Sequence, residues 1–480
     1  MRLCSTSVVR GTAVWLCVAS VSVAAADLRL IEAVKDQDHA SVNALLGENV
    51  DVNASEGDGA TALHWAIVRN DVDVVDELLR AGADVNAAND YGVTAISLAC
   101  LNRSGPMVET LLAQGADPNA TTAMGETVLM TCAGTGSPDA VAALFDHGAD
   151  NVNAKEMSYG QTALMRAAAQ DDLEVVRLLL AHGADAHARS TTYQLAVSLG
   201  NATAELGGGS VMVPQRGFTP LLFAARHGRV ENARLLLDAG VDVNEAAPTG
   251  ESPLVIASFS NQGEVARFLL ERGADPNDLG AGYAALHTAV VRGDLELVKT
   301  LCARGADPNI RLTKGSPQRR QSYWYAVSER WAGATPFWMA AKFAELDIMR
   351  ALADNGADAR LSTDTGITPL MAIAGISFRP GSVGLNRRDQ GIGPDAARLL
   401  KAATEQPTWE GTKLALELGS DVNATNERGD TAAHGAAALG FSSVVQLLAE
   451  HGADLDFKNK AERTAREVIC RSSDSGFGNC

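Results

Sequence analysis

The feature that most constrains this chain is a Gly-x-Asp step, usually Gly-Ala-Asp, that returns at a nearly fixed spacing. Most successive copies lie 32 to 35 residues apart, and three longer gaps exceed 33 by 24, 18 and 30 residues. Such a period indicates stacked, similar units rather than one globular core. The step occurs at Asp84, Asp117, Asp150, Asp185, Asp242, Asp275, Asp307, Asp358, Asp421 and Asp454, and Asp51, which follows Asn49-Val50, extends the series one period backwards.

A second motif follows most of these Asp residues after about ten positions. Examples are Thr61-Ala-Leu-His, Thr219-Pro-Leu-Leu, Thr335-Pro-Phe-Trp and Thr431-Ala-Ala-His. Thr is a good N-cap, and Pro in the next position suits the first helical turn. The two motifs in phase resemble the ankyrin repeat family over nearly all of the chain after residue 26. The resemblance implies an all-α ankyrin-repeat solenoid of helix-turn-helix units with short β-hairpin loops, about eleven repeats and a C-terminal capping helix.

The first 26 residues have the pattern of a secretory signal peptide. Arg2 and Arg10 supply a positive start, residues 11–23 are apolar, and Ala24–Ala26 offers small residues for cleavage. A retained anchor helix is the alternative. We therefore predict a signal peptide at 1–26, a single solenoid at 27–470 and a tail at 471–480, in an exported protein that is periplasmic or secreted. The excess of Arg over Lys suggests a bacterial source.

Three long insertions interrupt the period, near residues 189–215, 313–332 and 375–411. The first two fall in the loop that precedes a Thr-Pro motif, whereas the third separates the two helices of one repeat. Loops of this length are uncommon unless they are functional or disordered.

The formal net charge of the chain is -18, and removal of Arg2 and Arg10 with the leader leaves -20. So acidic a molecule repels nucleic acid and anionic lipid, so we expect neither as a partner. No later stretch is apolar for long enough to predict a membrane span after signal cleavage. We expect a monomer.

Seven cysteines occur, of which Cys4 and Cys17 lie in the leader. Cys470 and Cys480 lie close together in the tail and are predicted to form a disulfide in an oxidising compartment. The other three occupy small or apolar core positions of the repeat and are predicted to remain free. They are Cys100, Cys132 and Cys302.

No nucleotide-binding loop, nucleophile elbow, zinc-binding helix or paired-cysteine motif is found in the sequence. His64, His287 and His434 occupy the fourth place of the Thr-Pro-Leu-His motif, where the resemblance implies hydrogen bonds between repeats. We therefore predict no catalytic residue, cofactor or metal. The alternative is an exported enzyme whose insertions build a site around His227 or His287.

In the family that this chain resembles, partners are gripped by loop tips and by the exposed face of the inner helices. Transferred to this chain, these positions form a mixed early group with Tyr91, Leu101, Asn102, Met124 and Tyr159. The residues of a middle group include no acid and are rich in Arg and aromatic side chains, as binding hot spots are. The predicted partner-binding residues are Arg216, Phe218, Arg226, His227, Phe259, Tyr283, Arg292, Arg319, Arg320, Trp324, Trp331, Lys342 and Phe343.

These residues predict a non-catalytic protein-protein interaction module or scaffold outside the cytoplasm, whose partner presents an acidic surface to the concave face. A host-directed secreted effector is a further alternative. A structural interpretation competes at the residue level: the Tyr and Trp side chains pack the second insertion onto its own repeats, and the Arg side chains pair with nearby Asp.

Overall fold

The computed structural model describes residues 27–198, 210–315, 331–376 and 396–472. The expected signal peptide and its cleavage site lie outside these residues, as does nearly all of the tail. The chain divides into two compact units, Met1–Ala95 and Ile96–Cys480, each of which is described by itself. No helix in the described ranges combines the length and the apolar character needed to cross a membrane.

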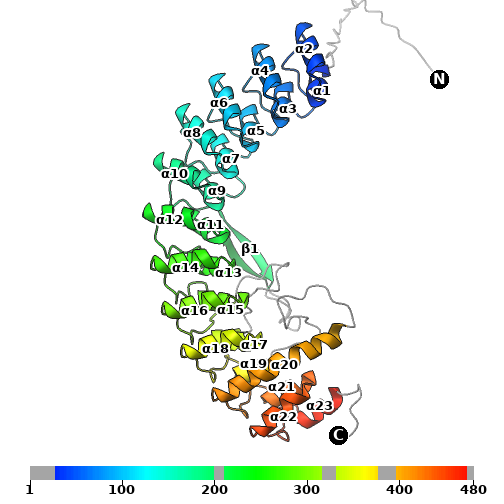
Figure 1. The fold of residues 1–480 in the computed structure, drawn as a ribbon, viewed down its shortest axis with the longest axis vertical. Helices are drawn as coiled ribbons and strands as arrows, with labels where there is room; N and C mark the ends of the chain where they lie inside the picture. Colours follow the sequence, from blue (N-terminus) through cyan, green and yellow to red (C-terminus); the bar gives the residue numbers. More distant parts are fainter. Residues whose placement is uncertain (1–26, 199–209, 316–330, 377–395, 473–480) are drawn as a thin grey trace, which may run out of the picture. The chain divides into compact units, whose positions relative to one another are not determined.

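Both units are built from antiparallel helix pairs, each with an inner helix followed by an outer one (Figure 1). The inner helices are α1 (Arg29–Lys35), α3 (Ala62–Val68), α5 (Ala95–Leu101), α7 (Val128–Thr135), α9 (Ala163–Ala169), α11 (Pro220–His227), α13 (Pro253–Phe259), α15 (Ala285–Arg292), α17 (Pro336–Lys342), α19 (Pro369–Ile373) and α21 (Ala432–Leu439). The outer helices are α2 (His39–Gly47), α4 (Val72–Arg80), α6 (Gly105–Ala113), α8 (Pro138–Asp146), α10 (Leu173–Ala181), α12 (Val230–Asp238), α14 (Gly263–Glu271), α16 (Leu295–Ala303), α18 (Leu346–Asp354), α20 (Ala396–Glu417) and α22 (Ser442–Glu450).

In the second unit, from α7 onward, each inner helix packs on the next inner helix, and each outer helix does the same in its own layer. The single helix α23 (Ala465–Ser472) packs on α21. The described residues thus contain eleven pairs and one further helix. The predicted all-α solenoid of eleven repeats is confirmed.

The repeat motifs fix the ends of these helices as the sequence suggested. The Thr162 side chain accepts a hydrogen bond from the Met165 N–H, and Thr335 does the same for Trp338. Several outer helices are capped by Asp in the same manner, for example α16 by Asp294. The Gly that follows each outer helix from α4 to α22 has a positive φ, which a side chain would disfavour, and Asn49 takes this place after α2.

A ladder of Asn side chains connects successive repeats outside the helices. The Asn277 side chain donates to the Gly305 carbonyl (2.9 Å), and its Oδ1 accepts from the Asp307 N–H (2.7 Å). Each such Asn therefore binds the Gly and the Asp of the next repeat, so the recurring Gly-x-Asp step is one half of this contact. The same two bonds are made by Asn53, Asn119, Asn153, Asn309 and Asn423.

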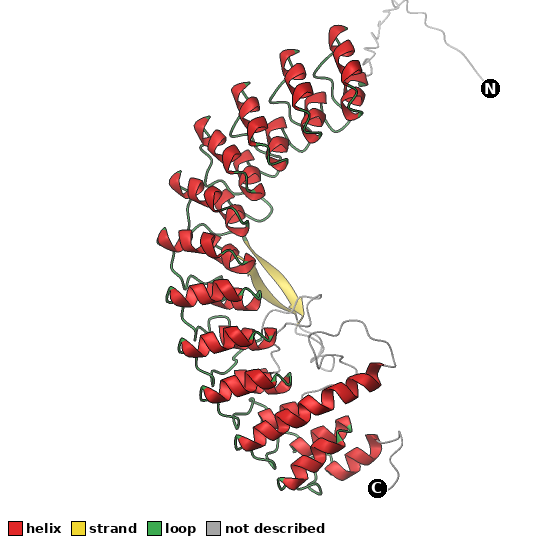
Figure 2. Ribbon diagram, in the orientation of Figure 1, coloured by secondary structure: helices red, strands yellow, loops and turns green. Residues whose placement is uncertain are grey.

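The first insertion contains an antiparallel hairpin that the sequence did not predict. Strand β1 (Thr192–Ser198) pairs with β2 (Ser210–Arg216), in register from Thr192 opposite Arg216 to Ser198 opposite Ser210. Figure 2 shows both strands projecting from the stack beside the inner helices. The third insertion also differs from its predicted bounds of 375–411. Helix α20 already begins at Ala396, so the later part of that range extends an outer helix.

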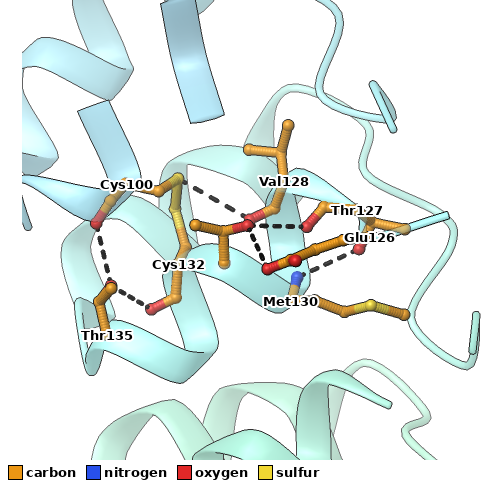
Figure 3. The surroundings of a disulfide bond; sticks show 8 residues. Cys100, Glu126, Thr127, Val128, Met130, Cys132 and Thr135 are labelled. Carbon is orange, nitrogen blue, oxygen red and sulfur yellow. Dashed lines mark hydrogen bonds between the residues drawn. A yellow bond between two sulfur atoms is a disulfide. The ribbon is translucent and has the colours of Figure 1, made fainter. Parts of the chain in front are cut away.

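The prediction that Cys100 and Cys132 are free is wrong, because the structure joins them in a disulfide between α5 and α7 (Figure 3). Both residues are fully buried, and their Cα atoms lie 4.6 Å apart. The Thr135 hydroxyl bonds the carbonyls of both cysteines. The two cysteines are separated by 32 residues, which is one less than the usual repeat period of 33. They therefore occupy nearly equivalent positions in adjacent inner helices.

Cys302 is free and half-buried, as predicted, and burial raises the pKa of its thiol. Cys480 and the side chain of Cys470 lie outside the described residues, so their disulfide stays a prediction.

Replacing Cys100 and Cys132 together by Ala should lower the free energy of unfolding by roughly 3–4 kcal/mol in the chain-entropy estimate, because the bond closes a loop of one repeat in the unfolded chain. Cys302→Ala serves as the control and should change stability little. Peptide mapping without reductant should recover Cys100 linked to Cys132. Alkylation of both thiols in unreduced protein would contradict the pairing.

Candidate partner-binding face

The structure divides the predicted partner-binding residues into those used by the solenoid and those left on its surface. Arg319, Arg320 and Trp324 lie outside the described residues. Arg216 is placed only through its backbone, at the end of β2. The other nine lie on or beside the inner helices of the second unit.

Tyr283 belongs to the interior rather than to an open face. It is 3% exposed, and its hydroxyl donates to the Glu251 carboxylate at 3.1 Å. Burial, with that carboxylate beside it, raises the pKa of Tyr283 well above its usual value. The middle stretch is therefore not free of acids, and the expectation that it was is wrong. Glu251 directly follows Gly250, at a loop position that the sequence argument passed over.

Arg292 and Phe259 form a contact between two repeats. The Arg292 Nε donates to the Phe259 carbonyl at 2.6 Å, and the guanidinium lies 5.4 Å from the centre of the Phe259 ring. The carbonyls at a helix C-terminus have no partner within the helix. Arg292 therefore satisfies the end of the neighbouring inner helix, which is a structural role.

The end of the second insertion packs on α17. The Trp331 ring lies 5.8 Å from the Phe343 ring in an edge-on arrangement and 6.0 Å from the Trp338 ring. The Lys342 ammonium lies 5.4 Å from the Trp331 ring, and desolvation lowers its pKa to about 8. These contacts favour the structural interpretation for Trp331, since the ring holds the insertion against its own repeat.

Arg226 and His227, at the end of α11, are exposed. Partial burial lowers the pKa of His227, and the nearby Arg226 and Arg229 lower it further, which indicates a locally positive field. Phe218 is half-buried and packs edge-on against Phe223, with ring centres 5.8 Å apart. Of the predicted residues with described side chains, Arg226 is therefore the most accessible permanent cation, while the lowered pKa of His227 favours its neutral form.

The inner-helix face also carries a hollow of about 400 Å³ that the sequence argument missed. It spans α5 to α11, from Leu101 at one end to Phe223 and His227 at the other. The seventh residue of the two inner helices between these walls is small, Gly134 in α7 and Ala169 in α9. The seventh residue of α11 is the much larger Arg226. Two small residues in succession leave the space open.

A polar network lies on the floor of the hollow. The Glu126 carboxylate receives hydrogen bonds from the Arg166 guanidinium and from the Thr131 hydroxyl, the latter at 3.0 Å. Arg166 and Glu126 come from adjacent repeats and form an ion pair across the floor. Among the described residues, no group of three or more His, Cys, Asp or Glu is placed to hold a metal ion.

Exposed apolar side chains gather on the repeats that form the hollow. Leu101 is 57% exposed, and Met157 on a loop tip is 73% exposed. Tyr159 on the same tip and Met124 on the neighbouring tip are also exposed. From the sequence, Leu101, Met124 and Tyr159 belong to the mixed early group and not to the predicted partner-binding residues.

The motif histidines have the structural role that the sequence predicted. His64 Nδ1 accepts from the Thr61 N–H, and its Nε2 bonds the Val93 carbonyl of the next repeat at 3.0 Å. His434 makes the same contacts with Thr431 and Arg463. His287 Nδ1 accepts from the Ala284 N–H, and desolvation lowers its pKa to about 4.

Comparison with known proteins gives the same repeat. A model of ankyrin repeats in three copies matches residues 30–122, 120–190, 204–280 and 247–311, which is more than half of the chain, and a model of one ankyrin repeat matches 428–460. Neurogenic locus notch homolog protein 1 is 33% identical over 141 residues in Xenopus laevis and 34% over 140 residues in Danio rerio, in each case 28% of this chain. Ankyrin repeat-containing protein F37A4.4 of Caenorhabditis elegans is 38% identical over 55 residues, or 12% of this chain. The matched parts are only 5 to 6% of these relatives' own lengths.

The stability of the fold should fall as the pH is lowered from about 6.5 to 4. The pKa of His287 is about 4 in the folded chain and near 6.5 in an unfolded one, so the unfolded chain takes up the proton first. The contribution of His287 is complete above pH ~6.5 and lost by pH ~4, on the order of 3 kcal/mol. Urea unfolding across this range should show a shallower decline for His287→Gln. The exposed His187→Gln is the control, and an unchanged decline in the His287 variant would contradict the assignment.

Proposed function

Because the chain belongs to the ankyrin repeat family, we propose that it is a non-catalytic protein-binding module that acts outside the cytoplasm. Ankyrin repeats generally serve as protein-protein interaction modules. The observation that carries the proposal is the inner-helix face of the second unit. There, exposed Leu101, Arg226 and His227 lie beside a hollow, on helices held rigidly by bonds between repeats.

The surface around Arg226 supports an acidic partner. The chain as a whole is strongly acidic, yet two arginines near His227 are close enough to lower its pKa. A positive patch on a negative molecule attracts a negative patch on a partner. The Arg226 side chain is also exposed, so a partner carboxylate can approach it from solvent.

Two observations support an exported protein. The expected leader at residues 1–26 has a charged start, an apolar run and small residues before Asp27. The buried Cys100–Cys132 bond is of the kind that persists in oxidising compartments and is rare in the cytosol.

Arg226→Ala should weaken partner binding by roughly 1–3 kcal/mol, because it removes an exposed cation from the centre of the proposed interface. The partner is first isolated by pull-down with the full chain from the periplasmic fraction, and its affinity is then measured by calorimetry. Arg177→Ala, an exposed arginine on the outer helix α10, is the matched control and should change binding by less than about 0.5 kcal/mol. Equal affinities for wild type and the Arg226 variant would exclude this surface.

Export predicts a mature chain that begins at Asp27. The intact mass of protein purified from its native host should equal that of residues 27–480, less two hydrogens for each disulfide. A full-length species in the membrane fraction would instead favour the retained anchor helix.

A further inference from the structure

We propose that the hollow between Leu101 and His227 is a second docking point, which receives uncharged apolar side chains from an extended or helical segment of the partner protein. This inference rests on the proposed protein-binding function and adds the chemistry of the partner segment. It differs from the contact proposed at Arg226, which is electrostatic.

The shape of the hollow follows from the residues at one helical position. In the four inner helices from α5 to α11, the seventh residue is Leu101 in α5, Gly134 in α7, Ala169 in α9 and Arg226 in α11. Leu101 lines one end of the hollow, and Phe223 and His227 of α11 line the other; the small Gly134 and Ala169 lie between them, and the hollow measures about 400 Å³. This volume is at the lower end of the range of ligand-binding pockets.

The charges on the floor of the hollow are already neutralised within the protein. The Arg166 guanidinium bonds the Glu126 carboxylate, which also receives the Thr131 hydroxyl. A partner carboxylate there would meet Glu126, and a partner cation would meet Arg166. Either charge would lose its water without gaining an unpaired counter-charge. An uncharged occupant avoids this desolvation cost.

Exposed apolar side chains gather on the repeats that form the hollow. Among the described residues of the second unit, six large hydrophobic side chains are counted as exposed, and four lie on the repeats of α5 to α9. They are Leu101, Met124, Met157 and Tyr159, while Leu418 and Phe457 lie elsewhere. Tyr and Met are enriched in the cores of protein interfaces. The loop tips therefore continue the apolar surface beyond the hollow.

The walls of the hollow are held in place before any partner arrives. The Cys100–Cys132 bond joins α5, which carries Leu101, to α7, which carries Thr131 and Gly134. A site that is already ordered loses less conformational freedom when it binds. The disulfide thus fixes the distance between the apolar wall and the floor.

A displayed library of random twelve-residue peptides, selected on the full chain, tests the inference. Enriched peptides should carry two or more large apolar residues and no net charge. Ala169→Trp fills the hollow from a half-buried position that lines it and should weaken their binding at least tenfold. Ala438→Trp is the matched control, since Ala438 is exposed at the same seventh position in α21, and it should bind as wild type does. Leu101→Ser removes the apolar wall without filling the space, and should weaken binding about threefold or more.

Salt distinguishes this contact from the one at Arg226. Binding of the enriched peptides should change less than about twofold between roughly 50 and 500 mM salt, because no net charge is paired. Equal binding to wild type and Ala169→Trp would overturn the inference. The inference would also be overturned if the selected peptides were acidic, lost binding to the Arg226→Ala variant and still bound the Ala169→Trp variant. That result would leave the protein-binding function intact. If wild type selects no peptide and retains no protein in the pull-down, both proposals fail.

Discussion

The structure depends on one contact repeated along the chain, in which an Asn side chain binds the Gly carbonyl and the Asp N–H of the next repeat. Asn277 illustrates it, with bonds of 2.9 and 2.7 Å. A single repeat cannot bury its apolar face, so stability requires that neighbours stack in register. The ladder supplies that register from outside the helices. Asn309 makes both bonds across the second insertion, to Gly356 and Asp358, and so keeps the stack continuous there.

The positions where this contact is absent explain where the chain accommodates its other insertions. His187 and Arg360 replace the Asn in the two repeats that precede the first and third insertions. Other side chains bridge these gaps: Arg189 donates to the Ala246 carbonyl and bonds Glu245, and the Ser420 hydroxyl donates to the Ala359 carbonyl. The insertions are therefore tolerated because a contact between repeats is preserved in another form.

The repeats were predictable because their signals are local and recur in phase. Thr caps, terminal Gly and the Gly-x-Asp step each act within a few residues, so eleven repeats follow from the sequence alone. The disulfide was missed because Cys100 and Cys132 were each judged as small core residues. Aligning the repeats shows that they differ by one position in adjacent helices, a signal that the sequence contained. The hairpin of the first insertion has no such repeated signal, and the hollow depends on side chains from four helices.

Bonds between repeats explain why an abundance of Arg and aromatic residues was a poor guide to the binding residues. Each inner helix ends in carbonyls without a helical partner, and an arginine of an adjacent repeat is well placed to satisfy them. Arg292 donates to Phe259, Arg229 to Ala169, and Arg103 to Gly136. Arginine therefore accumulates beside aromatic residues on this face for reasons of stacking. In a solenoid, the residues that indicate a partner are those that remain exposed after these bonds are assigned, such as Leu101, whose side chain the neighbouring repeats leave uncovered.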